Sequence, residues 1–168
     1  MVSAEELSYV YENVLVKLIE QREIELKFYI QQPAFSHMTL SVAFWHSDMY
    51  WNLYQKERCE FTCHAKYDNQ EFIILSDYEG RHPEISNLRD IFDGWSESEA
   101  TEDSDESLDL QFKLAHEALA IALCSERVKP LLEVLLETNN NYQNTRYSEV
   151  IRVEDPDGRF DVNFMHVV

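Results

Sequence analysis

The amino-acid sequence predicts an α+β fold, in which an antiparallel sheet of about five to seven strands is covered by helices. Residues 3–22 show helical periodicity, and residues 108–138 form the longest run of good helix formers. Between them, residues 38–78 are rich in aromatic and β-branched side chains, which favour strands. At 168 residues and 45% hydrophobic content, the chain is expected to form a single domain, 1–168.

The N-terminal helix is predicted to begin at a capping box, with serine at position 3 and glutamate at position 6. The apolar residues that follow share one helical face: Leu7, Val10, Tyr11, Val14, Leu15, Leu18 and Ile19. Near Glu23 the pattern changes to alternation, and residues 23–31 fit a strand. A longer helix is the competing interpretation, because Glu, Leu and Lys also favour helices. The sequence leaves this choice open, and Pro33 ends either element.

The sheet is predicted from four further segments that end in turn residues. These strands are expected at about 39–46, 50–55, 59–67 and 70–77. Asp68-Asn69 is predicted to form a two-residue hairpin turn, and Ser47-Asp48 a second, weaker one. Connections this short make neighbouring strands antiparallel.

A short helix is predicted from Pro83 through Phe92, ending at Gly94. The acidic stretch at about 96–107 follows, and it contains no apolar residue larger than alanine. We therefore expect it to be a mobile acidic loop.

A helical pair near residues 108–138 is predicted to form the centre of the fold. Between Leu114 and Leu123, apolar residues occur on nearly every side of the first helix, which is typical of a helix buried on all sides. Pro130 is expected to break the pair near Lys129.

The chain is predicted to close with a C-terminal β-hairpin. Its strands are expected at 147–153 and 159–167, on either side of Asp155-Pro156-Asp157-Gly158, a strong turn sequence.

The charge is the strongest global signal, with 32 acidic residues against 14 basic ones and a net charge of −18. Such a field repels nucleic acid and anionic membranes and attracts basic partners. No apolar run is long enough to cross a membrane, and the N-terminus lacks the basic segment of a secretory signal. Three cysteines imply no disulfide framework, so we expect a reduced, cytoplasmic protein.

No catalytic, metal or cofactor motif stands out. The three glycines are too far apart for a phosphate loop, and His116-Glu117 lacks a second histidine four positions after the first. Cys59 and Cys63 would stand about 13 Å apart on a strand, too far to share a zinc ion. We therefore predict no catalytic residues, no metal and no cofactor.

The function favoured by these patterns is a non-catalytic acidic module that masks the basic surface of a partner protein. Immunity proteins and inhibitors have this character, and a nucleic-acid mimic is compatible with it. The predicted contacts are aromatic residues and the acids of the acidic stretch: Tyr50, Trp51, Trp95, Glu97, Glu99, Glu102, Asp103, Asp105 and Glu106. For Trp45 and Trp51 the competing interpretation is a core pair on neighbouring strands.

Two alternatives remain. One is a small enzyme that uses carboxylate and histidine groups in a pocket on the sheet. The other is a secretion-chaperone-like protein or structural subunit whose aromatic turn, around Trp45 and Trp51, joins two copies in a homodimer.

Overall fold

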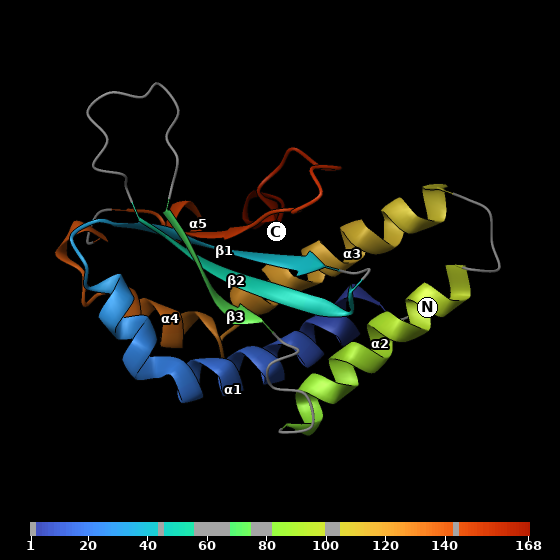
Figure 1. The fold of residues 1–168 in the computed structure, drawn as a ribbon, viewed down its shortest axis with the longest axis horizontal. Coiled ribbons are helices and arrows are strands. Elements are labelled where there is room, and N and C mark those ends of the chain that lie inside the picture. Colours follow the sequence, from blue (N-terminus) through green and yellow to red (C-terminus); the bar gives the residue numbers. More distant parts are fainter. Residues whose placement is uncertain (1–2, 44–45, 56–67, 75–81, 100–104, 143–144) are drawn as a thin grey trace.

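The computed structural model describes residues 3–43, 46–55, 68–74, 82–99, 105–142 and 145–168. Its helices and strands follow in this order: α1 (Ala4–Ile30), β1 (Phe35–Ala43), β2 (Asp48–Gln55), β3 (Asp68–Ile74), α2 (Pro83–Glu99), α3 (Asp105–Leu123), α4 (Lys129–Leu136), α5 (Tyr147–Val150) and β4 (Ile151–Val153). Two 3-10 turns, η3 (Asn140–Tyr142) and η4 (Phe164–His166), complete the described elements. In Figure 1, α1 runs along one side of the sheet and α3 lies behind it.

The α+β class is confirmed, but the predicted sheet of five to seven strands is wrong. In the described part of the chain, β3, β2 and β1 form an antiparallel sheet of three strands. The short β4 adds only a three-residue parallel pairing beside β1. The strand expected at 59–67 lies outside the described residues. The helix-rich result follows because residues 23–30 and 147–150 join helices instead of strands.

Helix α1 settles the open choice at residues 23–31 in favour of a helix. Its capping box is confirmed: Glu6 N–H donates to Ser3 Oγ (3.2 Å), and Ser3 N–H donates to Glu6 Oε2 (2.9 Å). A strand would place Ile24, Leu26, Phe28 and Ile30 on one face. The helix separates them: Leu26 and Ile30 are buried, whereas Ile24 is 85% exposed and Phe28 is 60% exposed.

The sheet has one apolar and one polar face. The apolar face is formed by cross-strand neighbours of β1 and β2: Met38 with Leu53, Leu40 with Trp51, and Val42 with Met49. The polar face is formed by the alternate pairs: His37 with Tyr54, Thr39 with Asn52, and Ser41 with Tyr50. The apolar face belongs to the core together with α1 and α3.

The two predicted turns have different outcomes. The weaker turn lies earlier than predicted: Ser47 is in the connection between β1 and β2 and has a positive φ of 49°, but Asp48 already belongs to β2, where it pairs with Ala43. Its position is fixed by α2, because Ser47 Oγ donates to Asp93 and Arg89 Nε donates to the Ser47 carbonyl (3.2 Å). The Asp68-Asn69 turn is wrong, because both residues belong to β3.

Helix α2 continues past Gly94 to Glu99, so its predicted end is wrong. Trp95 lies one turn after Phe92, and the two rings are 6.0 Å apart. Trp95 is only 8% exposed, so the apolar face of α2 extends one turn beyond the glycine. The acidic loop predicted at 96–107 is correspondingly wrong at both ends, since 96–99 belong to α2 and 105–107 to α3.

Helix α3 is buried over one broad face but not on all sides as predicted, because Lys113 is exposed and Leu114, Glu117 and Ile121 are only half-buried on the opposite face. The residues without exposure are Phe112, Ala115, His116, Ala118, Leu119, Ala120, Ala122 and Leu123. Helix α3 packs against α1 and also contacts β1 and β4. The break before α4 is confirmed, with Pro130 in the first turn of α4.

The prediction of a C-terminal hairpin is wrong. Side chains accept hydrogen bonds from the backbone N–H groups that would pair the two strands. Asp155 accepts from the N–H groups of Asp157 (3.0 Å), Arg159 (2.7 Å) and Phe160 (3.2 Å). Asn163 Oδ1 accepts from the Val153 N–H (3.1 Å). The turn itself forms, with Gly158 at φ 69°, but the segment after it ends in η4 instead of a strand.

His116 is a neutral histidine inside the core. Its Nδ1–H donates to the Phe112 carbonyl (2.8 Å), and its ring stacks on Phe164 at 5.1 Å between centroids. Burial lowers the pKa of His116 below its ordinary value, outweighing the hydrogen bond to Phe112 and the charges of Asp155 and Asp157, which raise it.

We expect Leu119→Ala to lower the free energy of unfolding by about 2–5 kcal/mol, because it leaves a cavity at a fully buried position of α3. Leu110→Ala is the matched control, since Leu110 is on the same helix and 55% exposed; it should cost less than about 0.5 kcal/mol. Urea denaturation measures both. Equal losses would show that α3 is not the centre of the core.

We expect the protein to lose stability as the pH falls below about 6.5, the ordinary pKa of histidine. The unfolded chain then binds a proton at His116 that the folded chain resists, so protonation favours unfolding. Denaturation at pH 7.5 and pH 5 measures this for the wild type and for His116→Gln. The loss should be smaller in the variant, and an identical loss in both would contradict the assignment.

Candidate functional site

The tryptophans predicted as partner contacts lie in the core. Trp51 is fully buried, and its Nε1–H donates to the sulfur of Met38 (3.3 Å). Trp95 packs against Phe92, so the surface interpretation of Trp95 is wrong. Tyr50 is half-buried on the polar face of the sheet. Neither indole is available to a partner while the chain is folded.

Four of the predicted acids lie at two neighbouring helix ends. Glu97 and Glu99 belong to the last turn of α2, and Asp105 and Glu106 to the first turn of α3. Only residues 100–104 separate the two helices, and Figure 1 places both ends at the same end of the molecule. We call these four residues the acidic end. Glu102 and Asp103 lie outside the described residues.

The acidic end is joined to the core through α3. Asp109, one turn further along α3, pairs with Arg159 (3.0 Å). The guanidinium of Arg159 also lies 4.6 Å from the ring centroid of the buried Phe112. Acids in the first turn of α3 interact favourably with the helix dipole, whereas those in the last turn of α2 do not.

A pocket of about 610 Å³ lies between α4 and the η3–α5 corner, partly open to solvent. We call it the α4 pocket. Its described lining residues are Glu133, Leu136, Glu137, Tyr142, Thr145, Tyr147 and Val150. Glu133, Leu136 and Glu137 share one face of α4 because they are three and four residues apart.

Two tyrosine hydroxyls hold the walls of the α4 pocket in place. The single Oη–H of Tyr142 is shared between the carbonyls of Phe35 (2.8 Å) and Ser36, at the start of β1. Tyr147 Oη donates to the Leu123 carbonyl (2.9 Å), at the end of α3. Asn139 anchors the same corner, because its Nδ2 donates to the Ile30 carbonyl (2.5 Å) at the end of α1.

Both phenols are neutral at physiological pH. Burial raises the pKa of Tyr142 to about 12. Burial also raises the pKa of Tyr147, with smaller contributions from Cys124 and Glu133. The only charged groups in the described lining are therefore the carboxylates of Glu133 and Glu137.

His37, on the polar face of the sheet, is not suited to act as a general base at neutral pH for the enzyme alternative. His37 stacks on Tyr54 at 4.6 Å between centroids, and burial and the nearby Arg152 lower the pKa of His37 to about 4. A general base that works near pH 7 needs a pKa close to 7. Within the described residues, no group of three His, Cys, Asp or Glu side chains could hold a metal ion.

A second, smaller pocket of about 500 Å³ lies beside the C-terminal turn. It is lined in part by Asp155, whose carboxylate already accepts three backbone N–H groups at its roughly four acceptor sites. These hydrogen bonds leave Asp155 little capacity to bind a ligand.

Sequence reasoning did not find the α4 pocket, because its residues come from three elements between positions 133 and 150. One local signal was present: Glu133 begins the last turn of α4, Glu137 is its C-cap, and the last turn contains no basic residue. Negative charge at a helix C-terminus is unfavourable by about 0.3–1 kcal/mol per group.

None of the described helices has the length and hydrophobicity needed to cross a membrane. Comparisons with protein families, curated proteins and solved structures gave no match to this chain.

We expect Glu137→Lys to raise the free energy of unfolding by about 0.3–1 kcal/mol, because a cation replaces an anion at the C-terminus of α4. Glu23→Lys is the control, since it makes the same charge change at an exposed position within α1. Thermal and urea denaturation compare them. A gain no larger than that of the control would show that the charge at the end of α4 carries no penalty.

Proposed function

We propose that this chain is a non-catalytic protein that binds a basic partner protein and masks its working surface. The observation that carries the proposal is the net charge of −18. In the described part of the chain, seven ion pairs each join one basic and one acidic side chain. Because each pair uses one basic and one acidic side chain, the excess of acidic over basic residues is the same after pairing.

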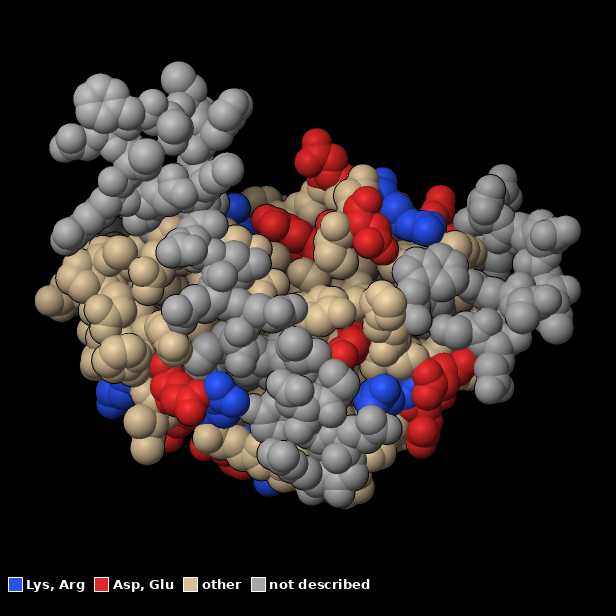
Figure 2. All heavy atoms as spheres, viewed as in Figure 1, with Lys and Arg blue, Asp and Glu red and all other residues tan. Residues whose placement is uncertain are grey.

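The surplus carboxylates lie at the surface. Among residues whose exposure is described, thirteen Asp and Glu are exposed, against five Lys and Arg. Three of those five bases are already paired within the chain: Lys113, Arg127 and Arg159. In Figure 2, most of the blue side chains touch red ones, and other red side chains stand without a blue neighbour. A surface of this kind attracts a basic protein over a distance and repels an acidic one.

The acidic end is the part of this surface that we assign to the partner. Its four acidic residues belong to the ends of two helices that only residues 100–104 separate in the sequence. The partner is a protein with a basic working surface, as in the pairing of an inhibitor or immunity protein with its target. A groove that binds nucleic acid is one such surface. In that case the chain acts as a mimic of nucleic acid.

The test compares two variants of equal net charge. The first replaces the acidic end by Glu97→Gln, Glu99→Gln, Asp105→Asn and Glu106→Gln. The control replaces four exposed acids outside the acidic end, by Glu23→Gln, Glu126→Gln, Glu149→Gln and Asp161→Asn. The intact chain is used as bait in an extract of its own source, and the captured protein is identified and its affinity measured.

The captured protein should be basic by its own sequence. Its affinity should fall about a hundredfold for the acidic-end variant, which loses four close charge contacts, and no more than about threefold for the control. Equal losses of affinity in the two variants would show that net charge alone, and not the acidic end, determines binding. A captured partner that is acidic would contradict the proposed function.

A further inference from the structure

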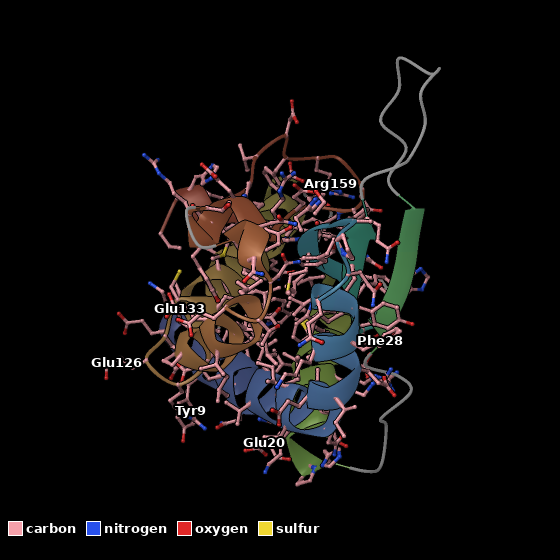
Figure 3. The ribbon with its side chains drawn as sticks, turned by 90° about the vertical axis from the view of Figure 1, so that its left-hand side faces the viewer. Tyr9, Glu20, Phe28, Glu126, Glu133 and Arg159 are labelled. Carbon is pink, nitrogen blue, oxygen red and sulfur yellow. The ribbon has the colours of Figure 1, made fainter. Side chains whose placement is uncertain are left out.

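We propose that the α4 pocket receives one basic side chain of the partner, an arginine or a lysine. This inference rests on the proposed function in one respect, because the basic partner supplies the cation. Figure 3 shows Glu133 at the surface of the molecule beside α4, on the same side as Tyr9 and Glu126. The pocket is therefore on an accessible face.

The charge of the pocket selects a cation. Glu133 and Glu137 are the charged groups in its described lining, and both lie at the C-terminal end of α4. The helix dipole adds partial negative charge at the same place. Glu137 has no ion pair among the described residues, so its carboxylate is available. A helix whose C-terminal end carries an unpaired carboxylate, here that of Glu137, gains from a cation placed beside it.

The walls favour a cation that carries an apolar stem. The hydroxyls of Tyr142 and Tyr147 are committed to backbone carbonyls, so their rings are the surfaces left for a ligand. Aromatic faces attract cations, and Leu136 and Val150 supply apolar contact for methylene groups. At about 610 Å³ the pocket lies within the range of small-ligand sites, so it can hold a long side chain.

The chain already places one cation against these groups. Lys129 Nζ lies 3.7 Å from Glu133 Oε1 and 5.4 Å from the ring centroid of Tyr147. An ammonium is therefore compatible with the carboxylate and the ring at this corner. Lys129 is on the first turn of α4, and it competes with an incoming cation for Glu133 and Tyr147.

The test titrates the intact chain with the capped tripeptide Gly-Arg-Gly, followed by the backbone amide signals of Thr145 and Val150. The matched probe is Gly-citrulline-Gly, which keeps the shape of arginine and removes its charge. We expect saturable binding of the arginine peptide and binding at least about tenfold weaker for the citrulline peptide. The capped Gly-Lys-Gly peptide distinguishes lysine from arginine.

Two double variants locate the binding. Glu133→Gln with Glu137→Gln should weaken the arginine peptide about tenfold, because both carboxylates lose their charge. Glu23→Gln with Glu126→Gln makes the same charge change outside the pocket and should leave the affinity within about twofold. Lys129→Gln should tighten binding about threefold by removing the internal competitor. Circular dichroism checks that each variant is folded.

Equal affinity in the two double variants, equal affinity for arginine and citrulline, or no shift of the pocket amides overturns the inference. These outcomes are independent of partner capture. If a basic protein is captured through the acidic end and the peptide does not bind, the pocket assignment fails and the proposed function stands. If the peptide binds and no basic protein is captured, the pocket assignment stands and the proposed function fails.

Discussion

The packing of α3 against α1 and the sheet is the interaction on which the other features depend. Ala115, Ala118 and Ala122 are fully buried, and their small side chains let neighbouring elements approach closely. Both proposed contact regions are joined to this helix. Its first turn carries Asp105 and Glu106 of the acidic end, and the carbonyl of Leu123 at its last turn accepts the hydroxyl of Tyr147 from the α4 pocket.

Negative charge is placed in this chain where it does not help the fold. Helices α2 and α4 both end without a basic residue in the last turn, and both have glutamates there. At α2 the nearby N-terminus of α3 offsets part of the unfavourable interaction, because that end of a helix carries partial positive charge. At α4 the described residues offer only Lys129 as a partner for Glu133. Glutamates at a helix C-terminus lower stability. Such residues are expected at positions where binding to a partner, and not stability, determines the amino acid.

The sequence was most informative where one local signal decides the structure. The capping box at Ser3, the buried helix that contains Leu119 and the break at Pro130 each depend on neighbouring residues, and each was predicted correctly. Residues 23–30 fit both a strand and a helix by periodicity, and packing against the core decides between the two. Leu26 and Ile30 reach the core on a helix, and Ile24 and Phe28 remain exposed.

The sequence was least informative where distant groups compete for hydrogen bonds. The C-terminal turn formed as predicted, but Asp155 and Asn163 took the N–H groups that a hairpin needs. The α4 pocket depends likewise on contacts across the chain, since Tyr142 reaches residues 35 and 36 and Asn139 reaches residue 30. Periodicity carries no information about such contacts, and this is why the pocket was missed.

The central claim is that unmatched carboxylates direct this chain to a basic partner. Association kinetics measured at several salt concentrations test it most directly. If the claim is correct, the association rate constant falls steeply between about 50 and 500 mM salt, and the dissociation rate constant changes much less, because long-range attraction is screened while close contacts are not. An association rate constant that does not depend on salt would contradict the claim.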